Sequence, residues 1–572
     1  MAWQASVKTD QVPVGALAVW KHDGQQYVIS HTDDGEFHVL DNRCPHEGYP
    51  LTSGELKGTA LTCSWHNWKF DVRSGACMLG EEGVRSFPSR VEDGVVLVDL
   101  SEPNPEDGWP ALLSSFDEGL FKHQVGRSAR DGVRLLKSGY DPHELLARIA
   151  LYDARHAEYG TTHALAIAAD CGRLLDRYTG MDAMYAIAPA IDMCGDSNRR
   201  LPARERPTAI PGATEVNLRA AVEAEDTERA LGLLRGAFDA DLPRATIEGW
   251  LFAILSDHFL NFGHQLIYLV KAQELFERGA EELAEEIYEG LLFNILMGTR
   301  EDTLPYMRSY FDRFTTCGKE LEDLWQAAGE DPQYDCRAIT TATLDGTLDD
   351  AFHSVLMALE SGASLAAIAQ AIVLAAAERF YRFDVAIDAD QDVSETWLWV
   401  THRLTFASAV RVALERFQSP DAIRFLIQAL AFVHTGKDMD ALPQNRTRLE
   451  AREMSPAEVV AAIADKDAQG AVSGTLGLVN NPEQLRVLRT ALEDLSLSDP
   501  LVRPIVIVHV VKTLLASFDE FDALARHPDR HWPLVACVRF LASPVVERRV
   551  AEQVRRSIHW VAEGKMPRKL TQ

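Results

Sequence analysis

The sequence predicts two domains of different class, a small all-β domain in residues 1–100 and a large all-α helical-repeat domain in residues 113–572. Three observations favour this division. Short segments rich in Val, Tyr and Phe alternate with turns in the first 100 residues, the apolar period becomes 3.6 afterwards, and a Pro-rich stretch separates the two patterns. Hydrophobic residues make up 47% and charged residues 25% of the 572-residue chain, which is typical of globular proteins.

The first 100 residues should form a small antiparallel β domain. Dipeptides such as Asp23-Gly24, Ser74-Gly75 and Asp93-Gly94 are typical of tight turns between strands. The stretch 101–112, with prolines at three positions, is predicted to be a linker. The expected strands are residues 16–20, 25–31, 37–40, 60–66, 68–72 and 95–100.

From residue 113 the chain should be helical throughout. Segments such as "HELLARIALYDARHA" and "LAAIAQAIVLAAAERFY" place apolar residues at helical spacing. No segment of this part reads convincingly as a strand, so the large domain is predicted to be all-α.

The net charge and the cysteine content limit which partners and which cellular compartment are expected. Lys plus Arg number 57 and Asp plus Glu 85, a formal charge of −28, which argues against nucleic acid and against an anionic membrane as partner. No apolar run reaches the ~20 residues of a membrane span, and the first residues do not resemble a signal peptide. Eight scattered cysteines do not form a disulfide framework, so we expect a cytoplasmic, reducing location.

The small domain carries a specific metal-ligand motif. Cys44-Pro45-His46 is followed, after sixteen residues, by Cys63-Ser64-Trp65-His66. Two thiolates can hold one iron of a [2Fe–2S] cluster and two imidazoles the other. A structural zinc site is the alternative for two Cys and two His.

With its flanks "CPHEGYPL" and "CSWHNWKFDVRSG", the motif resembles the Rieske family over residues 10–100. The resemblance implies a [2Fe–2S] cofactor, with Cys44 and Cys63 on one iron and His46 and His66 on the other.

Departures from the respiratory Rieske pattern indicate the ferredoxin and oxygenase branch. Tyr49 and Trp65 stand where respiratory proteins have a disulfide, and Trp68 and Phe70 where they have hydroxyls bonded to the cluster and its ligand. Hydrogen bonds to sulfur raise the reduction potential, so we expect a potential at the low end of the Rieske range. Asn67 stands where the family usually has Gly, the least costly replacement if the backbone needs a positive φ.

The helical part is internally repeated. Residues 263–305 and 401–443 align without a gap over 43 positions, ten of them identical, including His264/His402, Asp302/Asp440 and Pro305/Pro443. A shorter copy runs from His163, and a weaker fourth copy is indicated at His509. With the helix before each histidine, the copies start near residues 141, 240, 350 and, in the weakest case, 490.

The repeats suggest a second metal site. Each preceding helix adds a carboxylate, so the predicted catalytic set is His163, His264, His402, Asp153, Asp257 and Glu378. Histidines and carboxylates are what an iron site in a helical bundle requires. Asp257 and His264 are seven residues apart, about 10.5 Å along a continuous helix. For one metal to take both, the helices must break, and the breaks are expected at Gly160 and Gly263. The alternative is that each histidine only serves packing within its own repeat.

The helical part shows partial likeness to two other families. Rieske ring-hydroxylating oxygenases carry an Asp-x-x-His-x₄-His motif, and Asp153-Ala-Arg-His156 followed by His163 is close to it. Six residues separate these histidines, however, and the large sheet of that family is missing. The His-led helices also resemble those of questin-oxidase-like helical proteins, although no motif of that family is specific enough to identify matching residues in this chain.

The sequence therefore predicts a Rieske iron–sulfur oxidoreductase that relays electrons to a non-heme iron oxygenase site for a small organic substrate. Because no nucleotide-binding motif is found, a separate reductase or ferredoxin should be the electron donor. The alternative is a non-enzymatic Rieske electron carrier with a helical docking or sensing module.

Overall fold

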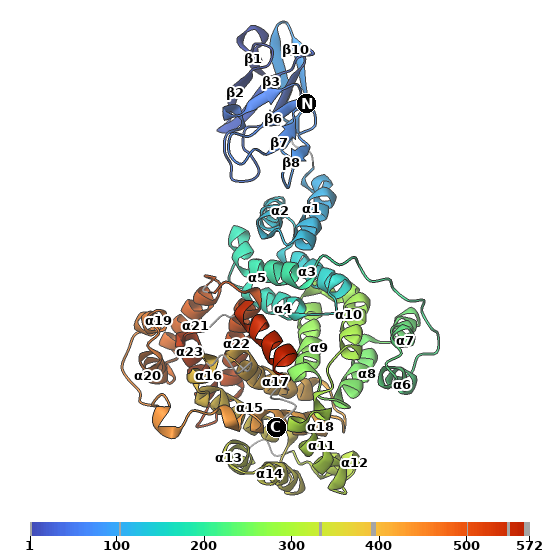
Figure 1. Cartoon of the computed structure of the whole chain (residues 1–572), viewed down its shortest axis with the longest axis vertical. Coiled ribbons are helices and arrows are strands. Elements are labelled where there is room, and N and C mark those ends of the chain that lie inside the picture. Colours follow the sequence, from blue (N-terminus) through green and yellow to red (C-terminus); the bar gives the residue numbers. More distant parts are fainter. Residues whose placement is uncertain are drawn as a thin grey trace. The chain divides into compact units, whose positions relative to one another are not determined.

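The computed structural model describes residues 3–101, 104–330, 334–389, 396–499, 501–545 and 550–565. It divides into two compact units, which are described separately (Figure 1). Unit 1 comprises Met1–Gly119 and Gln124–Tyr140, and unit 2 comprises Leu120–His123 and Asp141–Gln572.

The β domain of unit 1 is built from three small antiparallel sheets. The strands are β1 Trp3–Lys8, β2 Leu17–His22, β3 Gln25–His31, β4 Phe37–Asp41, β5 Glu55–Lys57, β6 Ala60–Thr62, β7 Lys69–Asp71, β8 Cys77–Leu79, β9 Ser86–Phe87, β10 Ser89–Glu92 and β11 Val95–Asp99. The sheet orders are β1-β11-β10, β2-β3-β4-β9 and β5-β6-β7-β8. The expected β domain is confirmed, and the structure adds β1, β5, β8, β9 and β10 to the strands expected from sequence.

Tight turns set the register of the hairpins. In the β2–β3 hairpin His22 pairs with Gln25, so Asp23-Gly24 forms a two-residue turn, and both residues have positive φ (47° and 79°). This is the turn conformation for which Asp-Gly is preferred. Asp93-Gly94 closes the β10–β11 hairpin in the same way.

Two helices belong to the same unit as the β domain. They are α1 Trp109–Lys122, of which residues 109–119 fall in unit 1, and α2 Val125–Lys137. Glu82, only 6% exposed, follows β8 and accepts hydrogen bonds from Arg130 and from Arg134 Nη1 (2.6 Å) of α2. The compact unit thus extends beyond the linker expected at residues 101–112, because a buried ion-pair network ties α2 to the β domain.

Unit 2 is helical, as predicted. Its helices are α3 Pro142–His156, α4 His163–Leu174, α5 Ala183–Ser197, α6 Glu215–Glu223, α7 Thr227–Asp239, α8 Arg244–Ser256, α9 His264–Leu275, α10 Ala284–Leu296, α11 Pro305–Thr316, α12 Leu321–Ala327, α13 Arg337–Asp345, α14 Leu348–Glu360, α15 Leu365–Arg382, α16 Val385–Ala389, α17 Trp397–Arg416, α18 Ala422–His434, α19 Pro456–Ala464, α20 Ala468–Leu478, α21 Pro482–Ser496, α22 Pro504–Ala523, α23 Trp532–Ala542 and α24 Val550–Ser557. In the described part of this unit, extended pairing is limited to isolated bridges.

The repeats appear as four three-helix sets in chain order, with further helices between them. In each set a first helix precedes a histidine-bearing helix, which a third helix follows: α3-α4-α5, α8-α9-α10, α15-α17-α18 and α21-α22-α23. The four histidine-bearing helices are therefore α4, α9, α17 and α22. Within unit 2, α9, α17 and α22 lie in the middle, between α6–α8 on one side and α19–α21 on the other (Figure 1).

The repeated aspartates have a structural role. Asp302 accepts from His258, just after α8, and Asp440 is paired with Arg379 and Arg382 at the end of α15. Backbone bridges at the same places join Leu260 to Arg300 and Phe383 to Asp440. Through these hydrogen bonds and ion pairs, each repeated aspartate holds in place the end of the helix that precedes the histidine-bearing helix.

No helix within the described residues combines the length and the apolar character that crossing a membrane would require.

Candidate metal centres

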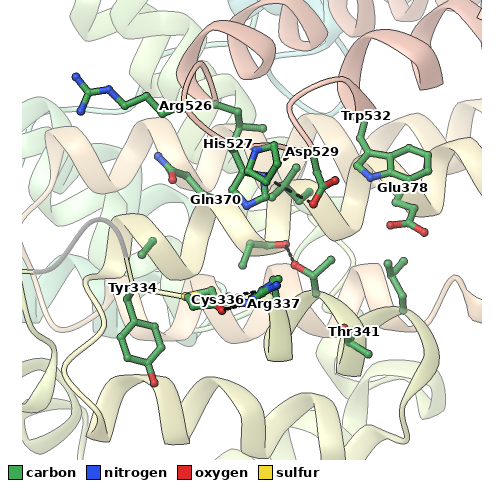
Figure 2. Close-up of a pocket in the computed structure, with 18 of the residues that line it drawn as sticks. Tyr334, Cys336, Arg337, Thr341, Gln370, Glu378, Arg526, His527, Asp529 and Trp532 are labelled. Carbon is green, nitrogen blue, oxygen red and sulfur yellow. Dashed lines mark hydrogen bonds and ion pairs between the residues drawn. The ribbon is translucent and has the colours of Figure 1, made fainter. Parts of the chain in front are cut away.

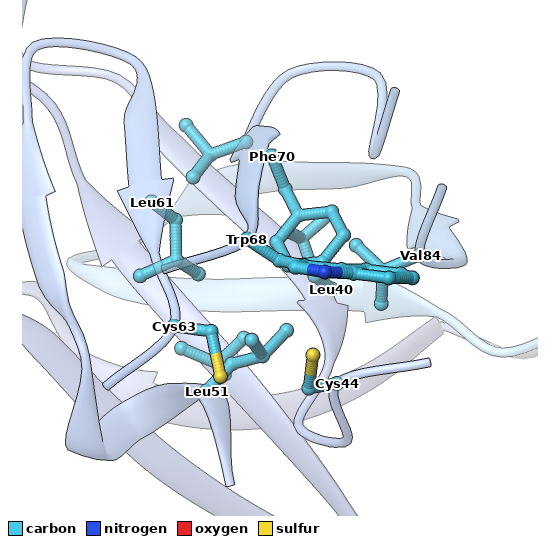
Figure 3. Close-up of a cluster of buried hydrophobic side chains, with 10 residues drawn as sticks. Leu40, Cys44, Leu51, Leu61, Cys63, Trp68, Phe70 and Val84 are labelled. Atoms are coloured by element: carbon cyan, nitrogen blue, oxygen red, sulfur yellow. The ribbon is translucent and has the colours of Figure 1, made fainter. Parts of the chain in front are cut away.

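Two loops of the β domain present the predicted cluster ligands. Cys44 lies on the loop between β4 and β5, and its N–H donates to the Tyr49 carbonyl at 2.8 Å. Cys63 opens the loop between β6 and β7, and its N–H donates to the Trp68 carbonyl at 2.8 Å. Both side chains are buried, at 2% and 1% exposure, and Figure 3 shows them near one another beneath the Trp68 indole. Burial, together with the neighbouring Cys63, raises the pKa of Cys44 to about 11.

The two histidines of the motif also come together. The His46 and His66 rings contact each other edge to face, with centroids 4.4 Å apart, and His66 is exposed while His46 is half-buried. His66 and Asn67 both have positive φ, 61° and 59°. Asn tolerates this left-handed conformation better than most residues, which explains Asn67 where the family usually has Gly.

The side chains at the positions that bear hydroxyls in respiratory Rieske proteins are used for packing. Trp68 stacks on His46 with centroids 4.8 Å apart and an interplanar angle of 17°. Phe70 is fully buried in the same core cluster as Cys44 and Cys63 (Figure 3). Neither residue can donate a hydrogen bond from a hydroxyl to the cluster or to its ligands.

The donor set fits a [2Fe–2S] cluster. Two buried thiols lie on the inner side of the loops and two imidazoles on the outer side, and soft thiolates are the ligands that such clusters require. The described cysteines are all free, so no disulfide competes for the thiols.

The second centre lies among the four histidine-bearing helices of unit 2. Helix α4 packs against α9, α9 against α17, α17 against α22, and α22 against α4, so the four helices close a ring. Each contributes one histidine to its middle: His163, His264, His402 and His509, named here the His quartet. One ring nitrogen from each lies within 4.8 Å of the others.

The quartet is closely spaced around its whole circuit. Successive ring centroids are 4.6, 4.4, 4.6 and 4.8 Å apart in the order His163, His264, His402, His509 and back to His163. The Nε2 atoms of His163 and His264 are 3.1 Å apart, and those of His402 and His509 are 3.0 Å apart. Nitrogens that share one metal at about 2.1 Å lie about 3–4 Å from one another. Independent packing of each repeat would have kept such rings ~10 Å apart.

Backbone carbonyls orient two of the rings. His509 Nδ1 donates to the Ile505 carbonyl at 2.6 Å, and His264 Nδ1 donates to the Asn261 carbonyl. In a neutral imidazole the hydrogen on Nδ1 leaves a lone pair on Nε2, which points into the quartet. His163 Nδ1 lies 3.2 Å from the Tyr268 hydroxyl.

Burial keeps the quartet neutral. It lowers the pKa of His264 to about 3 and that of the other three histidines well below the ordinary range. Neutral imidazole is the form that binds metals.

Two buried polar atoms beside the quartet have no hydrogen-bond partner among the described residues. They are His402 Nδ1 and Lys512 Nζ, one turn beyond His509 on α22. Burial lowers the pKa of Lys512 to about 7. Unpartnered buried polar atoms are rare and fit a site completed by a group that the chain itself does not supply.

A strained turn directly precedes His264. Asn261, Phe262 and Gly263 all have positive φ, 39°, 58° and 81°, directly before α9 begins at His264. A bulky residue such as Phe262 seldom adopts this conformation, and such strain clusters at functional sites. Phe262 stacks near His402, with centroids 5.9 Å apart. The break expected at Gly263 is present, as is the one at Gly160, where φ is 84°.

The carboxylates expected to join the histidines do not do so. Asp257 accepts hydrogen bonds from Arg219 and Arg424, each at 2.6 Å. Glu378 is paired with Arg382 at 2.6 Å and lines a different cavity, of about 700 Å³, beside Trp532 (Figure 2). Neither carboxylate joins the histidines, because arginines of other helices engage Asp257 and Arg382, one turn away on the same helix, engages Glu378.

Asp153 supports the loop that carries His163. It accepts from the Thr162 N–H (2.7 Å), the Thr162 hydroxyl (2.6 Å) and the Ser197 hydroxyl (3.1 Å). Burial raises its pKa to about 6. The His156 Nδ1 atom instead lies within hydrogen-bond distance of the Leu201 carbonyl oxygen, at 3.0 Å. The ring-hydroxylating motif considered for Asp153, His156 and His163 therefore does not assemble around one point.

An open cavity of about 840 Å³ reaches the quartet. Its wall includes His163 and Tyr268, together with Met193, Met297 and Ile505. Tyr268 is 4% exposed, and burial with the charge of Asp153 raises its pKa well above the ordinary range. The quartet is thus buried among helices yet open on one side to a molecule of moderate size.

Three residues of this centre were absent from the set expected from sequence: His509, Lys512 and Tyr268. His509 is the sixth residue of α22, as His402 is the sixth residue of α17. This shared position, in the weak fourth repeat, is the sequence feature from which His509 could have been predicted as a member of the quartet.

The comparisons with known proteins bear on the β domain. The family model described as the Rieske [2Fe-2S] domain matches residues 2–88. The biphenyl dioxygenase ferredoxin subunit of a Pseudomonas species is 35% identical over 104 residues, which cover 18% of this chain and 94% of that protein. The ferredoxin component of the p-cumate 2,3-dioxygenase system of Pseudomonas putida is 36% identical over 95 residues, 16% of this chain and 80% of that protein.

Oxygenases are also among the relatives of the β domain. The 4beta-methylsterol monooxygenase of Methylococcus capsulatus is 30% identical over 98 residues, 15% of this chain. This chain spans only 27% of that protein's length. The ligand loops, the family match and the near-complete coverage of a ferredoxin subunit agree with one another. Through its N-terminal domain, the chain belongs to the Rieske [2Fe-2S] family.

Proposed function

We propose that this protein is an oxidoreductase that uses electrons from its Rieske cluster at a metal ion held by the His quartet, in the oxygenation of a small organic molecule. The observation that carries the proposal is the convergence of four neutral imidazoles, from four repeats, at the end of an open cavity. A donor of single electrons in the same chain favours a metal that changes oxidation state. Imidazole ligands suit iron and copper as well as zinc, but zinc has no redox chemistry, and we propose iron.

In the N-terminal domain the chain's residues hold and shield the cluster. Cys44 and Cys63 would bind one iron and His46 and His66 the other; when bound, the cluster supplies electrons one at a time. Trp68 covers the His46 ring, whereas His66 stays exposed beside the stacked pair Tyr49 and Trp65. This exposed edge is where a redox partner would approach.

In the helical unit the chain's residues orient ligands and admit the substrate. The carbonyls of Asn261 and Ile505 fix the hydrogen on Nδ1 of His264 and His509, so that Nε2 is free to bind the metal. Asp153 holds the Thr162 end of the loop in front of His163. Met193, Met297 and Ile505 give the cavity a partly apolar wall for an organic substrate.

We propose a separate reductase or ferredoxin as electron donor, since the sequence shows no nucleotide-binding motif and two relatives are named as ferredoxin components. The free cysteines favour a reducing, cytoplasmic location. The high negative charge disfavours nucleic acid as a partner.

The iron content per chain tests the proposal. After anaerobic loading with Fe(II), the wild type should hold about three irons, two in the cluster and one in the quartet. His402→Ala should hold about two and keep the Rieske EPR signal. His434→Ala is the matched control, because His434 bonds Tyr310 and the Gly346 carbonyl outside the quartet and should leave about three irons. Two irons in the wild type would instead favour an electron carrier whose helices serve docking or sensing.

A further inference from the structure

Tyr268 touches both the quartet and the cavity. It lies on α9 one turn after His264, its hydroxyl is 3.2 Å from His163 Nδ1, and its side chain lines the cavity wall. Among the described residues, His163 Nδ1 is the hydrogen-bond partner of this hydroxyl.

Without a metal, the hydrogen between Tyr268 and His163 belongs to the tyrosine. His264 carries its own hydrogen on Nδ1, which donates to the Asn261 carbonyl, so its Nε2 can only accept. His163 Nε2, at 3.1 Å, must then be the donor of that contact. Its Nδ1 is left with a lone pair, and the Tyr268 hydroxyl donates to it.

Metal ligation reverses this arrangement. If His163 binds a metal through Nε2, its hydrogen must lie on Nδ1, and Nδ1 then donates to the Tyr268 oxygen. The hydrogen of the Tyr268 hydroxyl loses its acceptor. The remaining direction open to it is the cavity, whose wall Tyr268 forms.

We propose that metal binding at the quartet turns the Tyr268 hydroxyl from His163 toward the cavity, where it donates to an acceptor oxygen of the bound molecule. This inference rests on the function proposed above. The ligand that fits is a small organic molecule with a carbonyl-type acceptor oxygen. The cavity wall is mixed, because apolar side chains such as Met193 and Met297 lie beside charged ones such as Arg503. Metal binding and ligand binding are then coupled, and by linkage each strengthens the other.

Binding measurements on the full-length protein test the coupling. Zn(II) is loaded in place of iron, so that no redox reaction intervenes, and acetophenone serves as the probe with an acceptor oxygen. The wild type should bind acetophenone about fivefold more tightly with zinc than without it, the worth of one hydrogen bond. In Tyr268→Phe zinc should no longer affect acetophenone binding, and zinc itself should bind roughly tenfold more weakly because His163 loses its acceptor.

Tyr310→Phe provides a matched control, because it removes another Tyr–His hydrogen bond, to His434, outside the quartet. This variant should behave as the wild type. If zinc strengthens acetophenone binding equally in Tyr268→Phe, or if acetophenone does not bind the wild type in either form, the role of Tyr268 is wrong while a quartet that binds zinc still stands. If the wild type binds no zinc, both the role of Tyr268 and the proposed function are wrong.

Discussion

The two metal-ligand sets of this protein differ in how the chain builds them. The Rieske ligands lie within residues 44–66, on two loops of one small domain, and one of them, His66, is exposed. The quartet draws on four helices between residues 163 and 509, uses nitrogen alone and lies at the end of a cavity. An exposed ligand edge suits the passage of electrons, and a buried set beside a cavity suits chemistry on a bound molecule.

The difference also extends to what holds each ligand in place. Backbone hydrogen bonds within the two loops fix Cys44 and Cys63, so the site is local in sequence. The quartet depends on packing of helices that are far apart in the chain, and only its ring orientations are set locally, by the carbonyls of Asn261 and Ile505. One site can therefore be lost without the other.

The sharpest way to separate the two sets is Cys63→Ser. Removing a thiolate ligand should abolish the visible absorbance and the Rieske EPR signal altogether, while the helical circular dichroism and iron binding by the quartet persist. Cys77→Ser is the control, since Cys77 is a half-buried thiol outside the motif. A Rieske signal that survives in Cys63→Ser would contradict the ligand assignment.

The next effect concerns the strained turn before His264. In Gly263→Ala the new Cβ would clash with the Phe406 ring, at a φ of 81°. Overpacking and the left-handed backbone together should cost about 3 kcal/mol, lower the Tm of the helical unit by roughly 5 °C and reduce iron binding at the quartet.

Gly279→Ala separates backbone strain from crowding. Its φ is 108°, but no atom lies within 4 Å of the new Cβ, so the cost should be about 1 kcal/mol. Thermal unfolding and iron analysis measure both variants. Equal effects would show that the approach of Gly263 to Phe406 does not shape the quartet.

The sequence made the β domain predictable because its signals are local. A Cys-x-His and Cys-x-x-His pair with turn residues between strands fixes both fold and ligands within one short segment. For the helical domain, the repeats indicated a shared role for His163, His264 and His402, and the structure brings their rings together. The weak fourth repeat hid His509, whose position in its helix matches that of His402.

The carboxylates could not be assigned from sequence for a physical reason. An aspartate in a repeat can bind a metal, cap a helix or pair with a cation, and its neighbours in space decide which. Asp257 meets Arg424 of α18, and Glu378 meets Arg382 one turn away on α15. Asp153 accepts hydrogen bonds from Thr162 and Ser197. Only the packed structure shows that these groups already have partners.

A smaller effect should distinguish the Rieske domain from its respiratory counterparts. With Trp68 and Phe70 in place of hydroxyl-bearing residues, the midpoint potential should lie within ~100 mV of the low end of the Rieske range, about −150 mV. Introducing a hydroxyl by Phe70→Tyr, or Ser at Trp68, should raise it, because hydrogen bonds stabilise the extra charge of the reduced cluster.

Phe87→Tyr is the control for this measurement, since Phe87 belongs to the other core cluster of the β domain. It should leave the midpoint unchanged in a redox titration followed by EPR. A native midpoint near +300 mV would mean that these core residues have been misinterpreted.

The smallest expected effect is a pH dependence of the helical unit. The hydrogen bond to Asp302, and a second one to Glu223, raise the pKa of His258 above its ordinary 6.5. A histidine whose folded pKa is raised stabilises the fold fully below the unfolded pKa and loses that contribution as pH rises through the folded pKa. The stability difference between wild type and His258→Gln should therefore be largest near pH 6 and shrink above it. Because Glu223 is largely exposed, this stability difference should stay below about 1 kcal/mol.

His434 provides a control, because the opposite pH dependence of stability is expected for it. Burial lowers its pKa, so it destabilises the fold as pH falls below about 6.5 and not as pH rises. Denaturation curves of His258→Gln and His434→Gln between pH 5 and 8 should diverge from the wild type in opposite directions. Parallel curves would show that Asp302 does not hold a protonated His258, and the repeated aspartate would then pin the chain by its backbone bridge alone.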